Sequence, residues 1–257
     1  MKAPIIRDVW NNPWITHRPR RAATTVGLWV VLTSFVSWAV WSSSSSAQSQ
    51  GLAIQAVGDS YFDWNQDEGN DIPTLLGAGL DAAMVQNNAI GGTLVTDSGF
   101  DGRLSIPQQY QPGVWDWVVM SGGGNDVQVL CDCSACDQVL DNLISVDGSR
   151  GLIPAFADRV RADGARLLIM GYPFLDPNTD SDFINCNDEL TELHKRQARM
   201  ARRRGDVVFA SARTVINPED HRLFAEDLLH PSPAGGALIA AMLQRHIEEM
   251  AILAPGP

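Results

Sequence analysis

Short apolar runs that end in glycine-containing polar turns, with helical patterns between them, constrain the fold of this 257-residue chain most. We read five runs as strands, at residues 52–57, 82–85, 115–120, 165–170 and 206–210, and helices beginning near 71 and spanning 138–160 (broken near 147–148), 189–204 and 233–250. Strands that alternate with helices pair in parallel, and parallel strands are buried on both faces. We therefore expect an α/β fold of three layers, a flavodoxin-like five-stranded parallel sheet of order 2-1-3-4-5 with helices on both faces.

The first 49 residues differ from the rest of the chain. Residues 22–41 carry no charge and directly follow Arg18, Arg20 and Arg21. Twenty uncharged residues can cross a bilayer core about 30 Å thick, and the positive flank predicts a cytoplasmic N-terminus. A serine tract at 42–46 and a small-x-small cleavage pattern at 47–49 follow. We expect residues 1–49 to be a signal peptide or a membrane anchor with a Ser-rich linker, and residues 50–257 to be one exported domain, periplasmic or secreted.

The charge distribution agrees with this division. The formal net charge is −11, and residues 1–49 contribute +4, which leaves −15 for the remainder. An acidic domain is a poor partner for nucleic acid, which selects clustered Lys and Arg. We expect contact with a membrane only through the N-terminal segment, and a small-molecule or glycan partner for the domain.

Ser60 is the candidate nucleophile. It closes the tripeptide Gly58-Asp59-Ser60 directly after the first apolar run, where parallel sheets place their ligand crevice. A serine hydroxyl is a weak nucleophile unless a neighbouring base takes its proton. Taken alone, this tripeptide could equally be a turn or a helix cap.

His230 is the candidate base, with Asp227 as its orienting acid. Their spacing allows one loop to hold both, so that the carboxylate accepts from Nδ1 while Nε2 faces Ser60. The other four histidines are His17 before the apolar head, His194 and His246 in helical patterns where we expect them to be solvated, and His221, a rival in a loop.

Asn125 and Gly92 are candidates for stabilising an oxyanion. Asn125 follows three glycines after the third apolar run, and its side-chain amide can donate a hydrogen bond. Gly92 offers a backbone N–H from the loop after the second strand, although Gly91 is an alternative. Each could also be an ordinary turn residue.

The order of these blocks resembles that of the SGNH/GDSL hydrolase family, over about residues 52–250. The matching blocks are Gly58-Asp59-Ser60, Gly92, Gly123-Gly124-Asn125-Asp126 and Asp227-Leu228-Leu229-His230-Pro231. Tyr61 stands where Leu is usual, which changes no catalytic atom. The resemblance implies a Ser60–His230–Asp227 triad, an oxyanion hole from the amides of Ser60 and Gly92 and the Asn125 side chain, an acyl-enzyme mechanism, and no metal or cofactor.

The four cysteines lie at positions 131, 133, 136 and 186. An even count in an exported chain favours two disulfides. Because a Cys-x-Cys bridge is cramped, we favour Cys186 bonded to one of Cys131, Cys133 and Cys136, with the other two paired. A four-thiolate zinc site is the alternative. Either arrangement would join the loops after the third and fourth strands beside the expected cleft.

Three functions fit these residues. The first is an exported esterase that cleaves short-acyl or O-acetyl esters, because the segments expected to line the pocket (62–70, 95–110 and 172–187) offer no long apolar lid. The second is an acyl or acetyl transferase that uses the same site. The third is a non-catalytic carbohydrate-binding protein, which would have no need of Asp227, His230 and Asn125 together.

Overall fold

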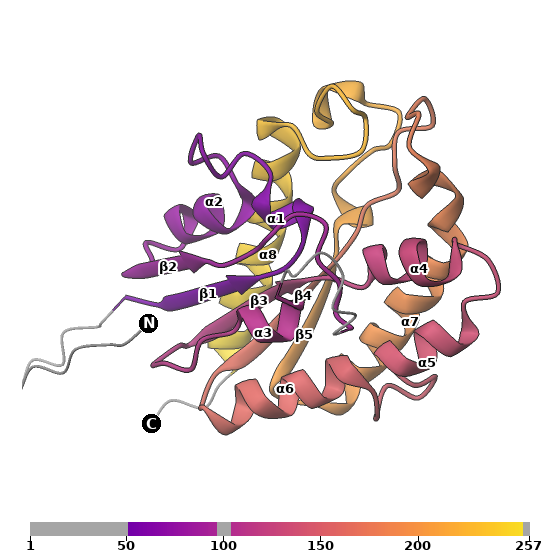
Figure 1. Cartoon of the computed structure of the whole chain (residues 1–257). Coiled ribbons are helices and arrows are strands. Elements are labelled where there is room, and N and C mark those ends of the chain that lie inside the picture. The colour runs from indigo at the N-terminus through magenta and orange to yellow at the C-terminus, as the bar shows by residue number, and fades with distance from the viewer. Residues whose placement is uncertain (1–50, 97–103, 254–257) are drawn as a thin grey trace, which may run out of the picture. The chain divides into compact units, whose positions relative to one another are not determined.

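A computed structural model describes residues 51–96 and 104–253 of the chain. Its strands form one parallel sheet of order β2-β1-β3-β4-β5, which confirms the predicted topology (Figure 1). The strands are β1 (Ala53–Val57), β2 (Met84–Asn87), β3 (Trp117–Ser121), β4 (Arg166–Gly171) and β5 (Val207–Ser211). The predicted N-terminal signal or anchor and the domain boundary at residue 50 lie outside the described residues.

The described helices alternate with these strands. They are α1 (Ser60–Asp63), α2 (Ile72–Gly79), α3 (Ile106–Gln109), α4 (Gly124–Cys131), α5 (Asp137–Leu143), α6 (Leu152–Ala162), α7 (Asn187–Arg203) and α8 (Pro233–Leu253), with 3-10 turns at Asp182–Cys186, Ala212–Thr214 and His221–Leu223. Helix α2 begins near residue 71 as expected, and Asp71 caps it by accepting from the Thr74 N–H at 3.0 Å. No helix in this part of the chain is long and apolar enough to span a membrane.

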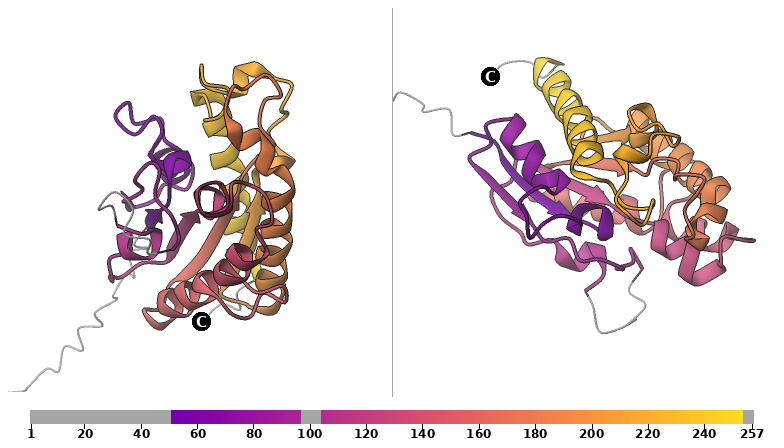
Figure 2. Two further views of the ribbon diagram at one scale, coloured as in Figure 1. Left: turned by 45° about the vertical axis from the view of Figure 1, so that its right-hand side comes forward. Right: turned by 90° about the horizontal axis from the view of Figure 1, so that it is seen from above.

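The helices form two layers around the sheet (Figure 2). Helices α2 and α8 pack against each other on one face, while α6 packs on β4 and α7 on β5 on the other. This arrangement follows from right-handed crossovers, because the chain runs from β1 to β2 in one direction and from β3 to β5 in the other. The central strands β1, β3 and β4 are almost completely buried, as their continuous apolar sequences predict.

Two elements differ from the prediction. The second strand begins at Met84 rather than residue 82, because Asp81 adopts a left-handed conformation and the Ala82 N–H bonds to the Gly77 carbonyl at the end of α2. In addition, a short helix, α3, forms between β2 and β3, where the sequence patterns predicted none. Ser105 and Gln108 make a reciprocal capping box at its start, with a proline in the first turn.

His194 is buried rather than solvated, so that expectation was wrong. It lies on the inner face of α7 with Leu190, Leu193, Gln197 and Met200, at the three- and four-residue spacing of a helix. Its ring meets Phe209 of β5 edge to face. Burial, together with the nearby charge of Arg213, lowers the pKa of His194 to about 3, so the ring is neutral. His246, in contrast, is only partly buried.

Candidate active site

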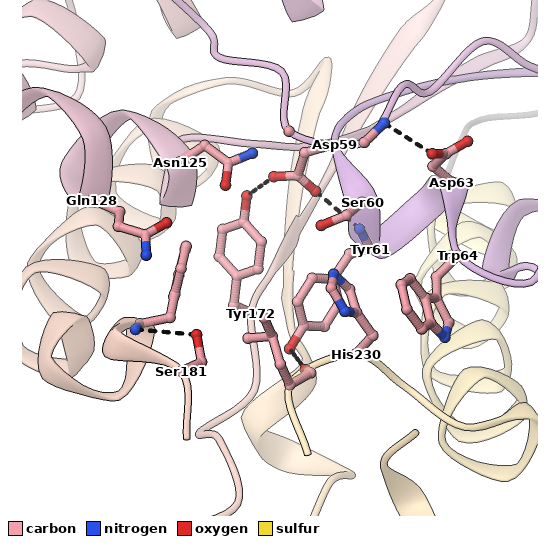
Figure 3. A pocket seen from close by; sticks show the side chains of 14 residues that line it. Asp59, Ser60, Tyr61, Asp63, Trp64, Asn125, Gln128, Tyr172, Ser181 and His230 are labelled. Atoms are coloured by element: carbon pink, nitrogen blue, oxygen red, sulfur yellow. Dashed lines mark hydrogen bonds between the residues drawn. The ribbon is translucent and has the colours of Figure 1, made fainter. Parts of the chain in front are cut away.

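The carboxyl ends of β1, β3 and β4 meet at one edge of the sheet. Val57 pairs with Met120, and Ser121 pairs with Met170, so the segments that follow these strands begin at the same level. Gly58 is needed where β1 passes β3, because a Cβ there would collide with the Ser121 hydroxyl. This edge carries a cavity of about 520 Å³, which is drawn in Figure 3.

Ser60 is the first residue of helix α1 and lines this cavity. The turn is held by Asp59, whose side chain caps the helix by accepting from the Tyr61 N–H at 3.2 Å. Ser60 therefore lies in the first turn of a helix, directly after β1. Its own N–H has no acceptor among the described residues, as is usual for the first amides of a helix.

Asp59 is fully buried behind the nucleophile. Its carboxyl group accepts hydrogen bonds from the Ser121 hydroxyl, at 3.0 Å, and from the phenol of Tyr172. Burial raises the pKa of Asp59, against the opposing effect of these donors. Through Ser121 and Tyr172, Asp59 connects the nucleophile turn to the ends of β3 and β4, so its role is structural.

His230 and Asp227 lie three residues apart and hydrogen-bond as predicted. The imidazole Nδ1 is 2.5 Å from the Asp227 Oδ2, while Oδ1 accepts from the N–H groups of Leu229 and His230 at 3.0 Å each. Burial opposes the ionisation of Asp227, but these hydrogen bonds outweigh it, so the pKa of Asp227 lies below its usual value. An ionised Asp227 accepts from Nδ1–H and leaves Nε2 as the proton acceptor. His230 lines the same cavity as Ser60 (Figure 3).

Asn125 lines the cavity from the first turn of α4. Its turn is shorter than the three glycines suggest, because Gly122 and Gly123 make it with positive φ angles of 158° and 102° and the helix already begins at Gly124. The Asn125 Nδ2 donates to the Thr93 carbonyl at 2.9 Å. That hydrogen bond fixes the amide and uses one of its two N–H groups, which leaves the second for a ligand.

The loop after β2 distinguishes Gly92 from Gly91. The Gly91 N–H donates to the Asp63 carboxylate at 2.9 Å. The Gly92 N–H has no acceptor among the described residues, and the φ of 74° at Gly92 favours glycine. Both glycines line the cavity, but Gly92 is the one whose amide is available to an oxyanion.

Asp126, beside Asn125, has a role that the sequence did not indicate. Its buried carboxylate accepts from the N–H groups of Val95 and Thr96, at 2.9 Å each. Burial raises the pKa of Asp126, and the two hydrogen bonds act against this rise. The Asn-Asp pair thus positions the loop that carries Gly92 as well as the side chain of Asn125.

The rival histidine lies elsewhere. His221 hydrogen-bonds through Nδ1 to the buried carboxylate of Asp176 and does not line the cavity. This pair joins the segment after β4 to the segment after β5. Thr179 makes a second link there, by donating its hydroxyl to the Asp227 carbonyl at 3.0 Å.

All four cysteines are paired in disulfides, Cys131–Cys136 and Cys133–Cys186. This confirms the favoured pattern, in which Cys186 bonds to one member of the cluster, and removes the zinc alternative because no thiolate remains free. The Cys133–Cys186 bond fastens the end of α4 to the segment that contributes Ser181 and Phe183 to the cavity.

The sequence predicted most other residues of the cavity wall only as members of three segments. Segment 62–70 contributes Asp63 and Trp64, and segment 172–187 contributes Tyr172, Ser181 and Phe183. The described part of segment 95–110 does not line the cavity. Gln128 was missed. It lies one helical turn after Asn125, so recognising that α4 begins at Gly124 would have placed both on the same face.

Comparison with known proteins identifies the family. The sequence profile of the GDSL-like lipase/acylhydrolase family matches residues 56–238, which is most of the chain. The protein belongs to this family. It is therefore an ester-hydrolysing enzyme of SGNH/GDSL type, and the sheet order agrees with that fold. A search of curated proteins finds no match.

Solved structures share the fold at low sequence identity. The aryl esterase of M. smegmatis is 15% identical, with a TM-score of 0.57, and the match covers 78% of this chain and 100% of that one. Phospholipase A1 from Streptomyces albidoflavus is 18% identical, with a TM-score of 0.52, over 78% and 99% of the two chains. A candidate SGNH hydrolase from Slackia heliotrinireducens is 20% identical, with a TM-score of 0.53, over 77% and 99%.

Proposed function

We propose that this SGNH/GDSL enzyme is an exported serine esterase that cleaves short-acyl esters, O-acetyl esters among them, through an acyl-enzyme on Ser60. The observation that carries the proposal is the hydrogen bond between Asp227 and His230 beside the cavity that Ser60 lines. This arrangement leaves Nε2 free to take the serine proton.

The mechanism follows from the positions of these groups. As the Ser60 oxygen attacks the ester carbonyl carbon, His230 takes the hydroxyl proton and Asp227 stabilises the resulting imidazolium. The carbonyl oxygen becomes an oxyanion and accepts from the amides of Ser60 and Gly92 and from Asn125. His230 then protonates the leaving alcohol. A water molecule, activated by the same imidazole, hydrolyses the acyl-enzyme and regenerates Ser60.

The cavity supports a small or polar substrate. Its wall combines the polar side chains of Gln128, Ser181 and Asp63 with the aromatic rings of Trp64 and Phe183. A long acyl chain needs a continuous apolar channel, because each buried methylene contributes about 0.8 kcal/mol only when it leaves water for an apolar surface. The mixed wall favours a short acyl group with a polar alcohol part, as in an acetylated glycan.

Export is supported by two independent features. Disulfides persist in oxidising compartments, and the chain contains two of them. The uncharged segment 22–41, preceded by arginines, has the composition of an export signal or an anchor. Fractionation of cells expressing the full chain, with and without residues 1–49, tests this part. The full chain should leave the cytoplasm and the truncated one should remain there.

The activity is tested with p-nitrophenyl esters of increasing acyl length, alongside an acetylated polysaccharide. We expect kcat/KM to be highest for acetyl or butyryl esters and to fall with longer chains, and Ser60→Ala to remove turnover while the circular dichroism spectrum stays unchanged. Undiminished turnover in Ser60→Ala would refute the assigned nucleophile. A preference for long acyl chains would refute the substrate class alone.

A further inference from the structure

The indole of Trp64 lies flat against the imidazole of His230. Their ring centroids are 4.0 Å apart and their planes are inclined by only 5°. Nearly parallel rings at this separation have their faces in van der Waals contact. Figure 3 shows the two rings beside each other at one side of the cavity.

Trp64 belongs to the same rigid turn as the nucleophile. It follows the last residue of α1, and its N–H donates to the Ser60 carbonyl at 2.9 Å. The backbone of Trp64 therefore cannot move far without moving Ser60. A single short turn of the chain carries the hydroxyl and the ring that packs on the base.

Two neighbours of Trp64 hold the residues on either side of His230. The Tyr61 hydroxyl donates to the Leu229 carbonyl at 2.7 Å. The Asn65 side chain donates to the Pro231 carbonyl at 3.2 Å. These bonds join positions more than 160 residues apart in the sequence, and they fix the backbone of the histidine loop relative to the nucleophile.

The charge on His230 changes during the reaction. When the imidazole takes the serine proton it becomes a cation, and the face of an indole attracts a cation through its quadrupole. Asp227 on its own loop hydrogen-bonds to His230, the buried Asp59 of the nucleophile turn interacts with it through charge, and the ring of Tyr61 lies 5.9 Å from it. Trp64 covers the face of the imidazole, whereas the hydrogen bond with Asp227 lies at the Nδ1 edge of the ring.

We propose that Trp64 is a positioning residue of this esterase, which holds the His230 imidazole against the nucleophile turn and stabilises its protonated form by stacking. This inference rests on the proposed role of His230 as the base. It assigns to the turn 60–65 a second task besides carrying the nucleophile, because its side chains position the base that activates Ser60.

The stack is tested in the full chain with Trp64→Leu, which removes the aromatic face, and Trp64→Phe, which keeps one. We expect kcat for p-nitrophenyl acetate to fall by about 5- to 30-fold in Trp64→Leu with KM almost unchanged, and Trp64→Phe to recover most of the loss. Phe174→Leu is the matched control. Phe174 is a similarly exposed aromatic residue (40%, against 37% for Trp64) that does not line the cavity, and its variant should keep wild-type kcat.

An NMR measurement follows the stack independently of turnover. The His230 ring protons, assigned through His230→Asn, should show an upfield ring-current shift that disappears in Trp64→Leu and persists in Trp64→Phe. No such shift in the wild type, an unchanged kcat in Trp64→Leu, or an effect confined to KM would each overturn the inference. If the shift is present but the wild type hydrolyses no ester, the proposed function fails while the stack itself stands.

Discussion

The phenol of Tyr172 donates a hydrogen bond to the buried carboxyl group of Asp59 and accepts one from the Gly124 N–H at 3.3 Å. Asp59 precedes the candidate nucleophile, and Gly124 precedes Asn125. One hydroxyl group at the end of β4 therefore connects the turn that presents Ser60 with the helix that presents Asn125, the proposed donor to the oxyanion. The two halves of the site are linked through the protein interior.

Tyr172→Phe tests this link. The substitution leaves a fully buried carboxyl group short of one donor, which should lower the free energy of unfolding by about 1–3 kcal/mol. Tyr110→Phe is the matched control, because the Tyr110 hydroxyl donates at 2.8 Å to Asp163, an exposed residue remote from the cavity. Urea unfolding should show a clearly smaller loss for Tyr110→Phe. Equal losses would mean that the Asp59 contact has no special importance.

Asn125→Ala should reduce catalysis without unfolding the protein. Loss of one oxyanion donor lowers kcat by about 10²- to 10³-fold with little change in KM. Asn88→Ala provides the comparison, since the Asn88 side chain also donates to a backbone carbonyl at 2.9 Å, that of Gln109, but does not line the cavity. Steady-state kinetics on a p-nitrophenyl ester separates the two variants. If both lose activity equally, Asn125 acts only by holding its loop.

Asp227→Asn should lower kcat by up to about 10⁴-fold, because an amide no longer selects the imidazole tautomer with Nε2 unprotonated. Asp220→Asn removes a carboxylate that pairs with Arg222 outside the cavity and should keep wild-type kcat. An equal loss of kcat in Asp220→Asn would show that the fall in Asp227→Asn comes from a disturbed loop conformation and not from the broken hydrogen bond with His230.

The lowered pKa of Asp227 also predicts how the free energy of unfolding depends on pH. Because the pKa of Asp227 is lower in the folded protein than its ordinary value near 3.8, the ionised carboxylate stabilises the fold above about pH 3.8, and this contribution disappears as the pH falls through the lower, folded-state pKa. The difference in unfolding free energy between the wild type and Asp227→Asn should therefore shrink in acid, as the pH falls through the folded-state pKa of Asp227. Urea unfolding at a series of pH values measures it. A difference that is undiminished once aspartates are protonated in both states would contradict the assignment.

The two disulfides should differ in their effect on stability. Cys133–Cys186 joins residues 53 apart, and Cys131–Cys136 joins residues 5 apart. In the chain-entropy description, closing the longer loop contributes about 4 kcal/mol and the shorter about 2 kcal/mol. The paired alanine variants, compared by urea unfolding, should lose stability in that order. The reverse order would show that strain or contacts of the folded state dominate.

Sequence patterns sufficed to predict the sheet order and the hydrogen bond between Asp227 and His230. Strands buried on both faces are continuous apolar runs, and the carboxyl ends of parallel strands share one edge, so the sequence alone predicts that Ser60 and Asn125 lie together. The helix starts were harder to predict. Glycines and an Asn-Asp pair favour a turn, and only the backbone shows that α4 begins within them.

Contacts between distant segments could not be predicted. His194 looked solvated because charged residues surround it in sequence, although helical spacing places it on the buried face of α7. The stack of Trp64 on His230 joins two turns that only the folded sheet brings together. Nothing in either local sequence indicates its partner.

The most direct test of the account is mass spectrometry of the protein after reaction with a fluorophosphonate. We expect one covalent adduct, on the peptide that contains Ser60, and its formation should be abolished by Ser60→Ala and strongly slowed by His230→Asn. An adduct on another residue, or esterase activity that survives with Ser60 unmodified, would contradict the account.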